Sequence, residues 1–112
     1  MKMGKTQHLI DMLIACIDEG QPKSVVVAAT YEHLQFMMER VRTTLELRGQ
    51  DYTVCRKRKA ILVDGSEIEF TSAGDIDIWR CGHRGYGEFW DEYTEYVYDR
   101  IQAGKGGYNI PE

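Results

Sequence analysis

The apolar run at residues 24–29 is the feature that most constrains the fold of this chain. It reads Ser-Val-Val-Val-Ala-Ala, and such a short, continuous, β-branched run is typical of a parallel strand covered on both faces. Apolar residues at spacings of three and four precede it in segment 9–17 and follow it in segment 34–45. These spacings predict a helix on each side of the strand, with Thr30 capping the second helix. The order helix, buried strand, helix predicts an α/β fold.

The second half of the chain changes to the shorter periodicity of strands. The expected strands there are residues 52–55, 60–63, 67–70 and 76–79. Asp64-Gly65 separates two of them and is a strong signal for a β-hairpin. A last helix with Trp90 and Ile101 on one face is expected to end at the glycines of segment 104–107. We therefore predict a small mixed sheet with a β-hairpin, flanked by about three helices, in one α/β domain over residues 1–103, followed by a flexible tail over 104–112.

Composition is that of a folded protein of one domain. The chain has 112 residues, of which 43% are hydrophobic and 29% charged, so a disordered chain is not expected. The net charge of −4 gives no electrostatic reason for strong non-specific binding to nucleic acid. Cys16, Cys55 and Cys81 are widely spaced and predict reduced thiols. The longest apolar stretch is too short to span a bilayer, and we expect a cytoplasmic protein.

Gly4-Lys5-Thr6 stands where the first predicted helix begins. In a phosphate loop, G-x-x-x-x-G-K-[ST], backbone amides surround the phosphates, the lysine reaches the terminal phosphate and the hydroxyl binds Mg²⁺. Segments 25–30 and 64–73, the Arg84-Gly85 turn and the Asp91-Glu92 pair follow in order. Together with Gly4-Lys5-Thr6 they resemble the phosphate-loop NTPases of the phage helicase and terminase type over residues 4–96.

That resemblance implies an ATP site. Gly4, Lys5 and Thr6 would bind the nucleotide, Thr6 and Asp91 would hold Mg²⁺, and Glu92 would orient the attacking water. The chain departs from the family in having only three residues before Gly4. We therefore expect the first strand and the front half of the loop to be missing, which removes much of the preorganisation that phosphoryl transfer needs. Hydrolysis is accordingly not expected of the chain by itself.

Two further surfaces are candidates for binding. A basic run and a nearby arginine are candidates for contact with nucleic acid or another anion, namely Arg56, Lys57, Arg58, Lys59 and Arg84. The run is equally typical of a charged turn that guards a strand edge. The last helix alternates acids with tyrosines, which suit protein interfaces, and the candidate partner surface comprises Tyr93, Glu95, Tyr96 and Asp99. The alternative is a helix with one core face and one solvated acidic face.

These observations leave three functions open. The sequence favours a small phage-type accessory or inhibitor protein, located in the host cytoplasm, that binds a protein partner without hydrolysis. The second is an ATP-binding NTPase completed by oligomerisation or by a partner chain, with ATP and Mg²⁺ as cofactors. The third is a nucleic-acid-binding module that uses the 56–59 run. An exposed sheet edge predicts a homodimer, because its free backbone groups can pair with another strand.

Overall fold

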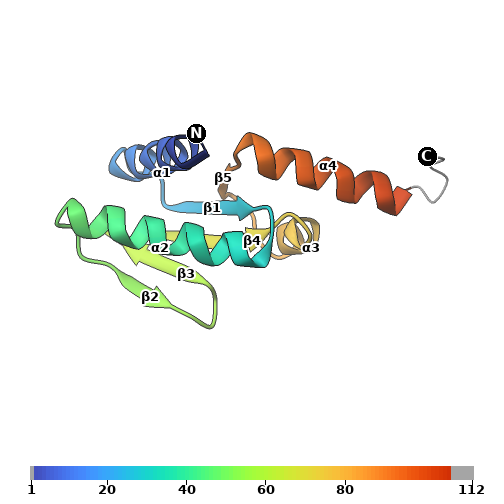
Figure 1. Ribbon diagram of the computed structural model, residues 1–112. Helices are drawn as coiled ribbons and strands as arrows, with labels where there is room; N and C mark the ends of the chain where they lie inside the picture. Colours follow the sequence, from blue (N-terminus) through green and yellow to red (C-terminus); the bar gives the residue numbers. More distant parts are fainter. Residues whose placement is uncertain (1, 107–112) are drawn as a thin grey trace.

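The computed structural model describes residues 2–106, with side chains placed for residues 5–104 (Figure 1). These residues form four helices and five strands. In chain order they are α1 (Lys2–Asp18), β1 (Lys23–Ala28), α2 (Tyr31–Leu47), β2 (Thr53–Cys55), β3 (Ala60–Val63), β4 (Ser66–Ser72), α3 (Ile76–Cys81), β5 (Gly87–Phe89) and α4 (Glu92–Gly106). The strands form one sheet in the order β2-β3-β4-β1-β5. β1 is parallel to β4 and β5, while β2, β3 and β4 are antiparallel, which confirms the predicted mixed α/β fold.

β1 lies inside the sheet, as its apolar run predicts. Val26 and Ala28 point into a hydrophobic core that α1 and α2 cover. Val25 and Val27 point to the opposite face and are also fully buried. Alternate side chains of a strand point to opposite faces, so a run with no polar interruption requires cover on both.

The main core fills the space between the sheet and the two N-terminal helices. Its helical members recur at spacings of three and four, and they include Ile10, Leu13 and Ile14 of α1 and Leu34, Met37, Val41 and Leu45 of α2. The predicted cap of α2 is present, since the His33 backbone N–H donates to the Thr30 hydroxyl over 3.1 Å. The amphipathic pattern therefore located both helices and the face that each one buries.

The β3–β4 hairpin turns at the predicted Asp64-Gly65 pair. Asp64 and Gly65 have φ values of 52° and 79°, the positive angles that a two-residue type I′ turn requires at both positions. Val63 pairs with Ser66 across the turn. This register points Ile61 and Val63 into the core.

Residues 76–79, expected to be extended, instead begin the helix α3. The alternation Ile-Asp-Ile-Trp is typical of a half-buried strand, but only Ile76 is buried, while Ile78 is 78% exposed. The Trp79 N–H donates to the Asp75 carbonyl, so a helical turn satisfies the backbone where no strand is available to pair with it. The structure thus has a fourth helix, and β5 is a strand that we did not predict.

The C-terminal helix is longer than the sequence suggested. α4 continues to Gly106 and so includes the beginning of segment 104–112, which we expected to be a flexible tail. Residues 107–112 of that segment lie outside the described residues. Cys16, Cys55 and Cys81 are free thiols. No helix in the described part of the chain has the length and apolar character to cross a membrane.

Candidate functional site

The three parallel strands β1, β4 and β5 run in the same direction. Their carboxyl ends therefore lie at the same end of the sheet, where open α/β sheets usually bind their ligands. Both α1 and α4 begin at this end, one beside the other (Figure 1). The sheet thereby places the Gly4-Lys5-Thr6 motif close to the Asp91-Glu92 motif.

A direct contact joins these two motifs. The Lys5 ammonium lies 3.0 Å from a carboxylate oxygen of Glu92, a residue 87 positions away in the sequence. Both side chains are exposed, Lys5 to 69% and Glu92 to 84%. Thr6, the next residue of α1, is buried. The structure therefore brings Lys5 of the first motif into contact with Glu92 of the second.

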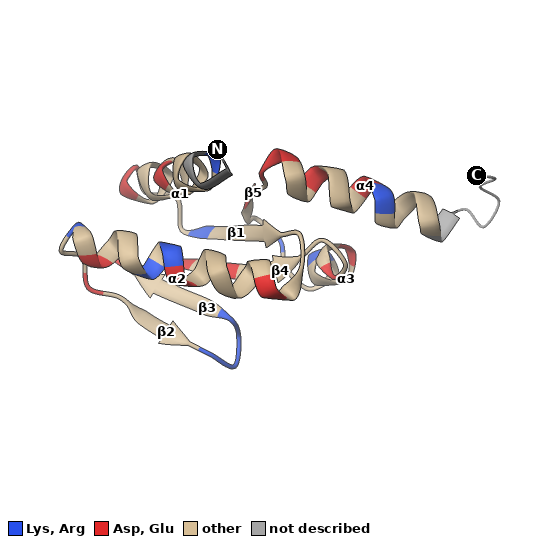
Figure 2. Cartoon of the chain, in the orientation of Figure 1, with Lys and Arg blue, Asp and Glu red and all other residues tan. Residues whose placement is uncertain are grey.

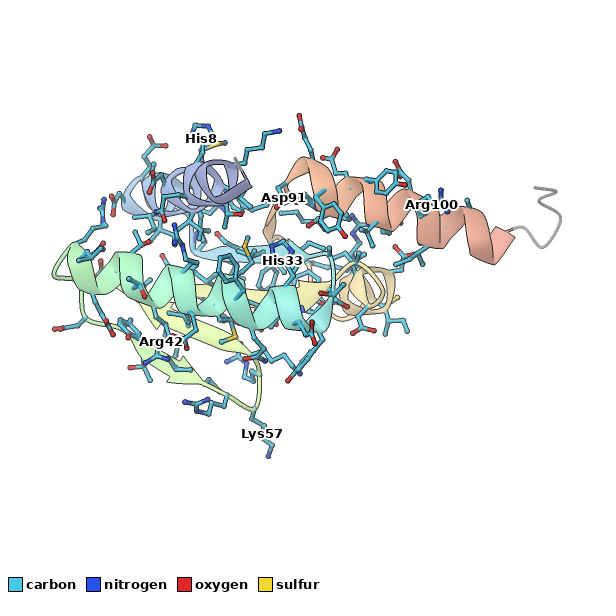
Figure 3. All side chains as sticks on the ribbon, viewed as in Figure 1. His8, His33, Arg42, Lys57, Asp91 and Arg100 are labelled. Carbon is cyan, nitrogen blue, oxygen red and sulfur yellow. The ribbon has the colours of Figure 1, made fainter. Side chains whose placement is uncertain are left out.

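Asp91 lies immediately before α4 and caps it. Its carboxylate accepts a hydrogen bond of 2.8 Å from the Thr94 backbone N–H, the usual contact of an N-cap side chain. Figure 3 shows Asp91 at the junction between α1 and α4. Thr94 is fully buried, and among the described residues its hydroxyl finds no hydrogen-bond partner. Capping explains why an aspartate stands here, one residue before Glu92, and it fixes the orientation of the Asp91 carboxylate.

The start of α4 is held from α3 through β5. Arg80 donates to both carboxylate oxygens of Glu88, over 2.9 and 2.8 Å, and Trp90 Nε1 donates to the same carboxylate over 3.0 Å. The hydrogen bond from Arg80 lowers the pKa of Glu88, against a smaller opposing effect of burial. Trp90 in turn packs edge-on against Tyr98 of α4.

A second α3 residue holds α4 further along. One carboxylate oxygen of Asp77 accepts from the Tyr98 hydroxyl and the other from Gln102 Nε2, both over 2.9 Å. The hydrogen bond to Asp77 raises the pKa of Tyr98. We call the residues that join α3, β5 and α4 the polar network; they are Asp77, Arg80, Glu88, Trp90, Tyr98 and Gln102. Sequence reasoning missed this network because it read residues 76–79 as a strand.

The carboxylate of Glu69, in β4, is buried near α3. Glu69 is almost fully buried and accepts from Arg58 over 2.8 Å and from Trp79 Nε1 over 3.0 Å. His83 Nε2 lies 3.4 Å from it. Burial raises the pKa of Glu69, but the hydrogen bonds with Glu67, Arg58 and Trp79 outweigh it and leave the pKa lowered.

This cluster explains part of the basic run. Arg58 turns inward to pair with Glu67 and Glu69, and Lys59 lies over the Tyr31 ring at 5.8 Å. Lys57 points away from the protein at the tip of the β2–β3 turn (Figure 3). Arg56 and Arg84 are exposed. Among the described residues, neither guanidinium forms a hydrogen bond or an ion pair. The structure thus does not gather the five predicted cationic contacts into one surface, and nucleic-acid binding stays a prediction.

The predicted partner surface lies on the exposed side of α4. Tyr93, Glu95, Tyr96 and Asp99 are all exposed, and Arg100 lies over the Tyr96 ring at 5.9 Å. Figure 2 shows acidic residues along this helix and basic residues at the β2–β3 turn. Thr94 is the one buried residue among the α4 side chains that the structure describes.

The donor set at the α1–α4 junction fits Mg²⁺ only together with phosphate. Mg²⁺ usually takes one or two carboxylates, water and phosphate oxygens rather than an all-protein cage. The resemblance assigns the metal to Asp91, whose carboxylate caps α4, and to Thr6, which is buried. Across the described residues, no group of three or more His, Cys, Asp or Glu side chains is arranged to hold a metal ion. In comparisons with known proteins, no family, no curated sequence and no solved structure matches this chain.

Proposed function

We propose that this chain binds the phosphates of a Mg²⁺–nucleotide, of the ATP class, where α1 and α4 begin. The observation that carries this proposal is the 3.0 Å contact between Lys5 and Glu92. It joins an ammonium and a carboxylate from opposite ends of the chain, near the carboxyl ends of the parallel strands, where open α/β sheets usually bind ligands.

The Lys5–Glu92 ion pair suits a site that exchanges partners. An exposed ion pair contributes little to stability, so a phosphate group, which carries more negative charge, displaces Glu92 from Lys5 at small cost. The first turn of α1 adds its unpaired N–H groups and the positive end of the helix dipole. In this proposal Lys5 binds phosphate, Thr6 and Asp91 hold Mg²⁺, and Glu92, once released, orients water.

The edge strand β5 is where this site would be completed. β5 pairs with β1 on one side and forms the end of the sheet in the described structure. Its outer N–H and C=O groups are able to accept a further strand, from a second copy or from a partner chain. Such a strand would end beside Lys5 and Asp91, so hydrolysis is proposed only for the completed assembly.

Calorimetric titration of MgATP into the purified protein tests this proposal. We expect saturable binding that Lys5→Ala abolishes, because the alanine variant loses the cation that contacts Glu92. Lys57→Ala is the matched control, since Lys57 is a lysine exposed in the β2–β3 turn, and it should bind as the wild type does. Absence of binding at millimolar nucleotide, or equal binding by Lys5→Ala, would overturn the proposal.

A second candidate function is binding of a protein partner through α4. The observation that favours it is the exposed row of Tyr93, Glu95, Tyr96 and Asp99 on a helix whose described side chains lie outside the main core. Tyrosines beside acids fit a partner surface that is basic and partly apolar. Reversing the charge with Glu95→Lys should weaken capture of such a partner, while Glu32→Lys, on α2, should leave it unchanged. Equal capture by both variants would remove this candidate.

A further inference from the structure

We propose that Asp77 is a positioning residue for the nucleotide site, acting through α4. This inference rests on the proposed function, and it identifies which part of the fold keeps Glu92 and Asp91 beside Lys5. Asp77 lies on α3 and contacts none of these residues itself. Its role follows from how α4 is attached.

α4 lacks the apolar attachment that holds the other long helices. None of the α4 side chains that the structure describes belongs to the main hydrophobic core, and its apolar residues Val97 and Ile101 are only half-buried, whereas the apolar rows of α1 and α2 are buried. Apolar burial is the main stabilising term in helix packing. The direction of α4 therefore depends strongly on its polar contacts.

Asp77 makes two of these contacts with one carboxylate. Its oxygens accept separately from Tyr98 and Gln102, each over 2.9 Å, residues four positions apart and thus on the same face of α4. Two bonds one helical turn apart fix both the position of the helix and its rotation about its own axis. Glu92 begins this helix, so rotation of α4 moves Glu92 relative to Lys5.

Zero-length crosslinking measures this positioning without any nucleotide. A carbodiimide activates the Glu92 carboxyl, the Lys5 amine attacks it, and an amide joins the two side chains while the carbodiimide leaves as a urea. Mass spectrometry of the linked peptides gives the yield. In Asp77→Ala we expect the yield to fall about tenfold, the loss typical of removing hydrogen bonds to a charged group, with circular dichroism unchanged.

A donor–acceptor exchange provides the rescue. Asp77→Asn keeps an oxygen for Tyr98 but presents an amide to Gln102, and both groups at the second contact are then donors. Adding Gln102→Glu restores an acceptor opposite that amide, so Asp77→Asn/Gln102→Glu should recover most of the crosslink. Asp99→Ala, which removes an exposed carboxylate from α4, is the matched control and should crosslink as the wild type does.

The same variants separate this inference from the proposed function. MgATP should bind Asp77→Ala about tenfold more weakly than wild type, with recovery in the double variant. If the wild type crosslinks but binds no MgATP, the proposed function fails and the positioning role stands. If Asp77→Ala crosslinks as efficiently as the wild type, or if the double variant fails to recover, the positioning role is overturned.

Discussion

The two long helices that begin at the site, α1 and α4, are held to the sheet in opposite ways. α1 buries Leu9, Ile10, Leu13, Ile14 and Ile17 in the core, whereas α4 is joined to α3 by the hydrogen bonds of Tyr98 and Gln102 to Asp77. Apolar packing is insensitive to direction, and hydrogen bonds require specific geometry. We infer that α1 provides the fixed side of the site and that α4 provides the adjustable side.

Removing apolar volume from α1 should have the largest effect on stability. Leu13 is fully buried, so Leu13→Ala should cost about 2–5 kcal/mol in the free energy of unfolding. Leu47, which ends α2 and is 84% exposed, is the matched control, and Leu47→Ala should change stability by less than about 0.5 kcal/mol. Urea denaturation measures both. Similar losses of stability in the two variants would contradict the assignment of Leu13 to the core.

Removing Arg58, the cation that pairs with the buried carboxylate of Glu69, should have the second largest effect on stability. Arg58→Ala removes the arginine that pairs with the buried Glu69, and a buried charge without its counterion is costly. We expect a clear loss of stability in urea denaturation at neutral pH. Lys57→Ala, one residue earlier in the same turn, should have almost no effect. If Lys57→Ala lost as much stability as Arg58→Ala or more, the pairing of Arg58 with Glu69 would not contribute to stability.

Weakening the polar network should release α4 more than it unfolds the protein. Arg80→Gln removes the paired hydrogen bonds to Glu88 and should cost about 1 kcal/mol globally, because the pair is partly exposed. Amide exchange in α4 should rise more strongly than in β1. Arg100→Gln, on the exposed side of α4, is the control. Uniform acceleration across both elements would mean that α4 belongs to the core after all.

Acid should weaken the polar network, although this effect should be the smallest. The pKa of Glu88 is lowered in the folded protein, so its contribution is complete above the unfolded value of about 4.3 and is lost as pH falls through the folded pKa. In Glu88→Gln, stability should therefore depend less on pH below about pH 5 than in the wild type. Urea denaturation between neutral and acidic pH gives this comparison. An unchanged pH dependence would exclude Glu88 as a contributor.

The sequence predicted the elements held by apolar packing better than it predicted the hydrogen bonds that hold α4. The run at residues 24–29, the apolar spacing of both helices and the Asp64-Gly65 turn are local signals, and each one located its element. The helix α3 was missed because Ile-Asp-Ile-Trp fits two periodicities, and only the tertiary structure decides between them. The bonds of Asp77 to Tyr98 and Gln102 depend on that helix, so no pattern in the sequence indicated them.

For the candidate site, the sequence named individual residues but not how they are arranged. The motifs at residues 4–6 and 91–92 identified Lys5, Thr6, Asp91 and Glu92 through a resemblance, and the structure places Lys5 against Glu92. The capping of α4 by Asp91 has a local cause, an aspartate three residues before Thr94. The distance between the motifs depends on how β1 and β5 pair, which involves residues far apart in the chain.

Hydrogen exchange of the wild-type protein, with and without MgATP, tests the central claim most directly. In the free protein we predict that α4 amides exchange by local opening while those of α1 and β1 exchange only on global unfolding. MgATP should slow exchange in α4 as Asp91 and Glu92 become fixed around the ligand. Equal protection of α1 and α4 in the free protein, or no response of α4 to MgATP, would contradict a site built between one fixed helix and one adjustable helix.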